Sequence, residues 1–216
     1  MLASYTWSKS LDLVDGDDDF IENAYRHRLT YGLSGWDRKH NFVSSGTYEL
    51  PFGPGKRMLN ANNVMGNVVG GWQFGGIFHL ASGQPSEVLA NNYADISAFA
   101  EMFADQVCSP KTSRVGLQWF SNSSPQCFVQ PAPGTYGVGG RNGVRNPRNN
   151  VVDFSLVRNF HLYETHQLQF RAEAFNALNH PVLSLGAGQG VEAQNVGVLT
   201  VAQPARVLQL ALRYSF

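Results

Sequence analysis

Polar and apolar residues alternate along several segments of this chain, most clearly in the C-terminal segment Ala205–Phe216. Successive side chains of a β-strand point to opposite faces, so residues two apart share a face. One face would carry Leu208, Leu210, Leu212, Tyr214 and Phe216. The other would carry Val207, Gln209, Ala211, Arg213 and Ser215. A helix would scatter both sets around its circumference, so the pattern predicts a strand with one apolar and one mostly polar face.

Five further segments alternate in the same way and are expected to be strands. They are residues 1–10, Asn41–Pro51, Gly71–Ala81, Val151–Leu162 and His166–Leu178. Arg171 and Glu173 fall on the polar face of the last of these, and burying such charges in a dry core would be costly. A water-filled barrel interior accepts them, so we expect four polar positions to face a lumen: Asp153, Gln169, Arg171 and Glu173.

The connections between these segments alternate in length. Long ones run over Leu11–Trp36, Gln84–Asn150 and Asn179–Pro204, and shorter ones over Phe52–Asn67 and Tyr163–Thr165. Long loops on one side and short turns on the other are typical of outer-membrane barrels. The pattern therefore predicts an all-β fold: about six strands of a larger antiparallel transmembrane β-barrel in the cell outer membrane. The long loops would lie on the exterior side, opposite Phe216.

The longest connection has two open interpretations. Asp95 could cap a short helix that carries Ile96, Phe99 and Phe103 on one face. An irregular loop is the equal alternative for so short a segment.

Composition narrows the function classes. Charged residues make up 15% of the chain, and 16 basic residues balance 16 acidic ones. This balance argues against a nucleic-acid partner, which requires a basic surface. The abundant glycine disfavours a helical bundle. No apolar run is long enough for a transmembrane helix. The first ten residues resemble a strand rather than a signal peptide, so we expect a fragment or a truncated gene.

The chain has two cysteines, Cys108 and Cys127, in a polar stretch. A disulfide between them would close a loop, and it would stabilise the fold by about 3 kcal/mol. It would also indicate an oxidising compartment. Two free thiols are the alternative.

Four candidate sites of chemistry fail on residue type or spacing. The acidic run Asp15–Asp19 lacks the glycine and glutamate of a calcium loop, although adventitious Ca²⁺ remains compatible with it. The glycine-rich stretch 137–142 ends in Asn142 instead of the last glycine of a dinucleotide loop, and 53–57 lacks the residues of a phosphate loop. The six histidines do not have zinc-helix spacing. We therefore predict no catalytic, cofactor or metal site, and no enzyme.

Arginines and aromatic residues suggest two further roles. Arg141, Arg145 and Arg148 could attract anions, although solvated loop arginines are the commoner explanation. Arg158 interrupts an apolar face near its end, where a long side chain can reach the headgroups. Amphipathic rings prefer the bilayer interface, which predicts aromatic girdles formed by Trp7, Tyr48, Trp72, Phe160 and Tyr214. The alternative is the core of a soluble β-sandwich.

Two sets of motifs resemble known families. The tail, with Phe216 last and Tyr214, Leu212, Leu210 and Leu208 at every second position before it, resembles the terminal signature that the outer-membrane assembly machinery reads. The barrel end of Oar-like TonB-dependent receptors is similar to six stretches in the same order, namely residues 5–12, 36–42, 48–53, 70–73 with 82–85, 145–147 and 170–181. The resemblance implies a barrel of about twenty-two strands around a plug.

These features predict that residues 1–216 are the C-terminal part of such a barrel, with the plug and N-terminal domains absent. The function expected first is active uptake of a large nutrient, powered through an inner-membrane complex that contacts only the missing N-terminal part. The alternatives are a passive porin or adhesin barrel and a soluble binding sandwich. Expected partners are outer-membrane lipid, the assembly machinery and an unknown nutrient. Six strands with free edges cannot close, so the isolated chain is expected to aggregate, oligomerise or fail to insert.

Overall fold

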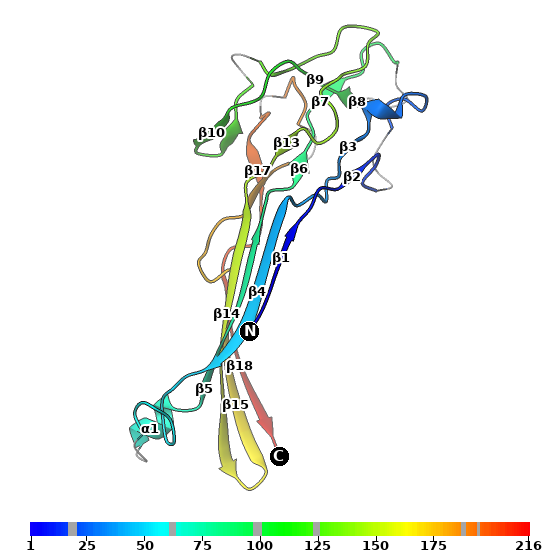
Figure 1. Cartoon of the computed structure of the whole chain (residues 1–216). Helices are drawn as coiled ribbons and strands as arrows, with labels where there is room; N and C mark the ends of the chain where they lie inside the picture. Colours follow the sequence, from blue (N-terminus) through cyan, green and yellow to red (C-terminus); the bar gives the residue numbers. More distant parts are fainter. Residues whose placement is uncertain (17–20, 61–63, 97–100, 123–125, 187–188, 194) are drawn as a thin grey trace.

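The computed structural model describes residues 1–16, 21–60, 64–96, 101–122, 126–186, 189–193 and 195–216. Its main feature is one six-stranded antiparallel sheet, in which the six strands lie side by side in the order in which they occur in the chain (Figure 1). The strands, in order across the sheet, are β1 (Leu2–Trp7), β4 (His40–Glu49), β5 (Trp72–Ala81), β14 (Asn149–Tyr163), β15 (His166–Phe175) and β18 (Val207–Ser215). All six segments predicted from alternation are therefore strands of one sheet.

Five of the six strands, all except the 6-residue β1, are long enough to cross a bilayer. Strands β4, β5 and β15 have 10 residues each and β18 has 9, close to the ~9–11 residues that a tilted transmembrane strand requires. The 15-residue strand β14 is longer because its two neighbours lie at different heights. It pairs with β5 over Asn149–Arg158 and with β15 over residues 154–163.

The pairing register carries the alternation across the whole sheet. Directly opposed residues share a face, so each row of partners can be followed from strand to strand. One row consists of Tyr48, Phe74, Leu156, Ala172 and Leu210. The adjacent row, on the other face, consists of Thr47, Gly75, Ser155, Glu173 and Gln209. The sheet therefore has one continuous apolar face and one continuous polar face, as the sequence pattern predicts.

The apolar face is not covered by protein. Leu208, Leu210 and Leu212 are 70%, 72% and 70% exposed, and no larger second sheet packs on them: the other sheets of the described chain have two strands each. A soluble β-sandwich would bury this stripe against a second sheet. The exposed stripe fits a lipid-facing surface.

The two ends of the sheet differ as predicted. Three long connections (residues 8–39, 82–148 and 176–206, here called the first, second and third exterior loops) gather at one end (Figure 1). They contain the 3-10 helix η1 (His27–Leu29) and six small two-stranded sheets. Their strands are β2 (Leu11–Asp12), β3 (Gly32–Leu33), β6 (Pro85–Ser86), β7 (Leu89–Asn91), β8 (Glu101–Phe103), β9 (Asp105–Gln106), β10 (Thr112–Val115), β11 (Gln118–Phe120), β12 (Phe128–Val129), β13 (Val144–Arg145), β16 (Leu183–Leu185) and β17 (Leu199–Ala202).

The opposite end carries the short connections and the C-terminus. The turn between β4 and β5 holds a helix, α1 (Val64–Val69), and the β14–β15 connection is a tight hairpin. Gly53 and Gly70 let the turn close, since a Cβ atom on Gly53 would lie 2.5 Å from the Cα atom of Gly70. No helix among the described residues is long and apolar enough to cross a membrane.

The helix considered after Asp95 is not formed as proposed. Asp95 has a positive φ of 48°, whereas an N-cap residue takes an extended backbone conformation. Phe103 belongs to strand β8, which pairs with β7. Residues 97–100, including Phe99, lie outside the described part of the chain.

The assignment of a lipid face and a polar face to the sheet leads to a direct prediction about two adjacent residues of β18. A lysine at Leu210, on the lipid face, should cost about 2–4 kcal/mol, because a cation near the bilayer midplane loses its hydration. A lysine at Gln209, one residue away on the polar face, should cost less than 1 kcal/mol. The free energy of unfolding of the full-length protein in lipid bilayers measures both. Equal costs at the two positions would contradict the assignment of faces.

Candidate functional site

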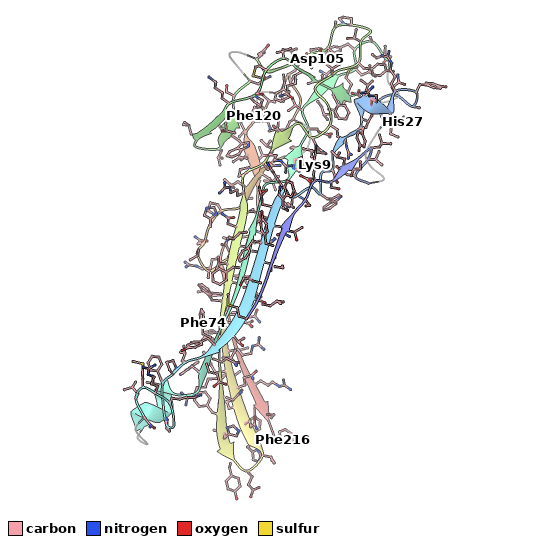
Figure 2. All side chains as sticks on the ribbon, in the orientation of Figure 1. Lys9, His27, Phe74, Asp105, Phe120 and Phe216 are labelled. Carbon is pink, nitrogen blue, oxygen red and sulfur yellow. A yellow bond between two sulfur atoms is a disulfide. The ribbon has the colours of Figure 1, made fainter. Side chains whose placement is uncertain are left out.

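The three exterior loops fold together as one unit with its own core. Most of the buried apolar side chains of the described chain lie here rather than in the sheet. The cluster consists of Val88, Ala90, Met102, Ala104, Phe120, Cys127, Phe128, Val144, Leu185 and Leu199. Figure 2 shows Phe120 and Asp105 in this unit, far from Phe74 in the sheet and from Phe216 at the other end. We call this unit the loop cluster.

A disulfide fixes the second exterior loop. The structure joins Cys108 to Cys127, whose Cα atoms are 4.6 Å apart. Cys127 is buried in the apolar cluster and Cys108 packs against it. The bond holds β9 and β12, which pair through Gln106 and Phe128, beside the core of the loop cluster.

Buried ion pairs tie the first exterior loop to the second. The side chain of Arg141 is fully buried and contacts both Asp12 and Asp15. Burial alone would raise the pKa of Asp15, but hydrogen bonds from the Gly35 amide and the Ser34 hydroxyl, together with the charge of Arg141, lower it below its ordinary value. Asp15 is therefore charged at neutral pH, and it holds the guanidinium of Arg141 in place together with Asp12.

A second pair acts beside the first. Asp37 is fully buried and accepts hydrogen bonds from Arg145 and from the amide of Ser10, the latter at 2.7 Å. Burial would raise the pKa of Asp37, but these hydrogen bonds keep it below its usual range. Arg145 also donates to the carbonyl of Gly83, 3.2 Å away. The base of the loop cluster is thus held by charge as well as by apolar contacts.

Two sequence interpretations change as a result. Arg141 is buried and paired with two half-buried carboxylates, and Arg145 is paired with the buried Asp37, so the interpretation of them as solvated loop arginines is wrong for these two; Arg148 is exposed. Asp15, the first residue of the acidic run considered for Ca²⁺, is instead paired with Arg141; residues 17–20 lie outside the described chain. In the described residues, no group of three or more acidic, histidine or cysteine side chains is placed to hold a metal ion.

The glycine-rich stretch before Asn142 serves packing. A Cβ atom on Gly137 would lie 1.7 Å from the carbonyl oxygen of Phe103, and one on Gly139 would lie 2.2 Å from that of Ala104. Such distances exclude any side chain at either position. The glycines allow this backbone to lie directly against β8 and its continuation.

Glu22 is an unusual group in the loop cluster. It is buried, and its Oε1 atom accepts a hydrogen bond from the amide of Phe103, while no hydrogen-bond partner of Oε2 is present among the described residues. Burial, together with the nearby charges of Asp105 and Glu87, raises its pKa from 4.5 to about 7. Sequence reasoning missed this residue, because only the fold brings it to β8.

The polar face of the sheet holds the four residues expected to line a lumen. Asp153, Gln169, Arg171 and Glu173 all lie on the face opposite the leucine stripe. Arg171 forms an ion pair with Glu173, and Asp153 accepts a hydrogen bond of 2.8 Å from the amide of Asn176. The wall is therefore hydrogen-bonded along its own surface and remains polar.

The aromatic residues predicted as girdles all lie on the apolar face. Trp7 is at the loop end of β1, and the other four, Tyr48, Trp72, Phe160 and Tyr214, are near the opposite end of their strands. Arg158 stacks on two of them, with its guanidinium carbon 5.6 Å from the ring centroid of Trp72 and 4.3 Å from that of Phe160. Its guanidinium donates to the carbonyl of Val68 in α1, so the cation reaches the end of the apolar face, as expected.

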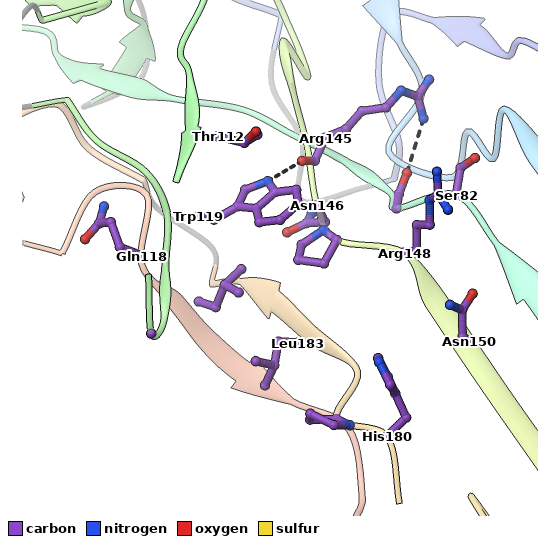
Figure 3. A pocket seen from close by; sticks show the side chains of 15 residues that line it. Ser82, Thr112, Gln118, Trp119, Arg145, Asn146, Arg148, Asn150, His180 and Leu183 are labelled. Carbon is purple, nitrogen blue, oxygen red and sulfur yellow. Dashed lines mark hydrogen bonds between the residues drawn. The ribbon is translucent and has the colours of Figure 1, made fainter. Parts of the chain in front are cut away.

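A cavity of about 710 Å³ lies where the loop cluster meets the top of β14 (Figure 3). Its walls come from the second and third exterior loops and from the beginning of β14. It is lined by Ser82, Gly83, Thr112, Gly116, Gln118, Trp119, Arg145, Asn146, Pro147, Arg148, Asn150, His180, Pro181, Leu183 and Leu199. The sequence pattern did not single out this cavity, which we call the rim cavity.

Comparison with known proteins fits this arrangement. The model of the outer membrane beta barrel domain matches residues 1–209, nearly the whole chain. The chain belongs to this family. Searches of the curated proteins and of the solved structures gave no match. As a member of the outer membrane beta barrel family, the protein resides in the cell outer membrane, with its apolar face toward lipid.

The Arg141 ion pairs of this barrel domain can be tested by removing the cation. The substitution Arg141→Met should lower the free energy of opening of the loop cluster by about 2 kcal/mol. This is below the ~3–5 kcal/mol typical of broken buried pairs, because Asp12 and Asp15 keep some contact with water. Hydrogen exchange of the Gly35 amide, which donates to Asp15, measures the change. Arg57→Met, at the other end of the sheet, should leave this exchange unaltered; an equal effect of both variants would count against the pairing.

Glu22 makes the loop cluster sensitive to pH. Its pKa is raised in the folded protein, so the folded state favours the neutral acid. The contribution of Glu22 to stability is therefore full below about pH 4.5 and is lost as the pH rises through about 7. Protection of the Phe103 amide, corrected for intrinsic exchange, should fall over this range.

The variant Glu22→Gln keeps an acceptor for Phe103 and cannot ionise, so the decline should disappear. The matched control Glu101→Gln, an exposed residue in β8, should retain it. A decline that persists in Glu22→Gln would assign the pH dependence to another group.

Proposed function

We propose that this chain forms the C-terminal part of the barrel of a TonB-dependent receptor, which takes up a large nutrient actively across the outer membrane. The observation that carries the proposal is the loop cluster. It is built from three exterior loops, with an apolar core, a disulfide and buried ion pairs. Loops built in this way form a fixed exterior surface that can recognise a ligand before transport.

The sheet supports the same proposal. Strands β1 and β18 are its edges, and each has one paired neighbour in the described chain. A membrane barrel has to pair every edge, because unpaired backbone groups in hydrocarbon cost several kcal/mol each. Six strands are too few for a barrel with a polar, hydrated wall, so closure requires further strands. A large barrel of this kind has room for a plug and for a large solute.

Two partners follow from the proposal. The stripe Leu208, Leu210, Leu212, Tyr214 and Phe216 lies on one face of β18, at the edge of the sheet, where the assembly machinery can reach it. The inner-membrane coupling complex would act through a plug domain and its coupling segment. That no reaction is catalysed stays a prediction.

The test uses the full-length protein extracted from outer membranes, with KCl as the conducting salt in planar bilayers. A plugged receptor should show no steady conductance until urea unfolds the plug, and should then open. A steady open conductance without urea would support a passive porin and contradict the proposal. A protein that conducts in neither condition, and that no crosslinker joins to the inner-membrane coupling complex in cells, would favour the adhesin alternative.

A further inference from the structure

The lipid-facing apolar side chains of the sheet, here called the apolar belt, end in a row of polar residues at the end of the sheet that carries the exterior loops. Within the sheet, Leu80 lies opposite both Phe42 and Asn150. Two residue pairs further out, the Ser82 amide donates to the His40 carbonyl at 2.8 Å, and the His40 amide donates to the Ser82 hydroxyl at 3.2 Å. The β5–β14 register, continued by one step, places Arg148 beside Ser82. On the lipid-facing side of the sheet, the apolar side chains therefore end at one level, and polar groups follow beyond it.

The rim cavity opens at this level. Asn150 is on the same face of β14 as Val152, Phe154 and Leu156, which is the lipid side and not the lumen side. Above the end of β15, the third exterior loop takes the place of a paired strand, and the Ala177 amide donates to the Val152 carbonyl at 2.7 Å. The cavity is thus beside the outer leaflet, separate from the path along the polar wall.

The lining of the rim cavity is cationic without a counterion. Arg148 is exposed and has no hydrogen-bond or ion-pair partner in the part of the chain that the structure describes. None of the described residues that line the cavity is acidic. The other lining arginine, Arg145, differs because Asp37 neutralises it. In its described part, the cavity thus presents one unpaired guanidinium and no carboxylate, which favours an anion, and arginine matches phosphate oxygens especially well.

The remaining walls suit a sugar ring. The indole of Trp119 is held in place by a hydrogen bond of 2.6 Å to the Arg145 carbonyl, and it forms part of the cavity wall (Figure 3). Asn150, His180 and Thr112 add polar side chains around it. A flat apolar ring among short polar groups suits a ring with one apolar face and several hydroxyls. The volume of about 710 Å³ is that of a small-molecule site.

We propose that the rim cavity binds a phosphorylated sugar, with Arg148 on the phosphate and Trp119 under the ring. Its place on the lipid side, directly above the apolar belt, favours the headgroup of a phosphorylated glycolipid of the outer leaflet as the source. A free sugar phosphate has the same chemistry. The proposal rests on the fold and on membership of the barrel family, and it does not depend on active uptake.

The test measures dissociation constants of the full-length detergent-solubilised protein for three probes: diphosphorylated lipid A, enzymatically dephosphorylated lipid A and glucose 1-phosphate. Lipid A should bind, and its dephosphorylated form should bind at least about tenfold more weakly, since about 1.4 kcal/mol of phosphate contact corresponds to that factor. Arg148→Gln should weaken lipid A binding about tenfold, and Arg148→Lys should weaken it less. Asn150→Asp, which adds a repelling charge, should also weaken it.

The matched control is Arg57→Gln, the same change of charge at the opposite end of the sheet, which should not alter binding. Tight binding of glucose 1-phosphate would identify a free sugar phosphate as the source, whereas binding of lipid A alone would identify the glycolipid. Equal binding of the phosphorylated and dephosphorylated lipids, or unchanged binding in both Arg148→Gln and Asn150→Asp, would overturn the proposal. Because binding is measured apart from conductance, either proposal can fail without the other.

Discussion

The structure depends on one constraint, namely that groups facing hydrocarbon have to be apolar and the backbone between them has to be hydrogen-bonded. A strand satisfies both requirements only if its neighbours keep the register, because a slip of one residue would turn every polar side chain toward lipid. The row from Tyr48 to Leu210 shows that five strands keep it without interruption. The hydrogen bonds between the strands and the alternation of apolar and polar side chains therefore favour the same register.

The same constraint divides the protein into two parts that are stabilised differently. In the sheet, the apolar side chains point outward to lipid and contribute little to an internal core. The loop cluster faces water, so it buries its own apolar residues, together with a disulfide and the charged pairs of Arg141 and Asp37. A buried ion pair is costly to form, but once formed it specifies which loop lies against which.

Sequence reasoning captured the sheet and missed much of the loop cluster for a physical reason. A period of two is a local signal, and it located all six strands and both ends of the sheet. Contacts in the loop cluster join distant residues, such as Arg141 and Asp12, 129 positions apart, and no local pattern reports them. The cysteines were the one visible marker. Nothing in the local sequence pattern marked Glu22 or the rim cavity. Of the two open interpretations of the stretch after Asp95, the helix that includes Phe103 was wrong, because Phe103 pairs with Leu89 of β7.

The length of β14 has a geometric consequence for the complete pore. Its first ten residues pair with β5 and its last ten with β15, so the wall steps by five residues at this strand. In a closed tube, the sum of such steps fixes how far the strands lean, and more lean gives a larger circumference for the same strand count. If both neighbours paired with the same residues of β14, this step would be lost, the tube would be narrower, and the third exterior loop would lose the gap in the wall that it now occupies.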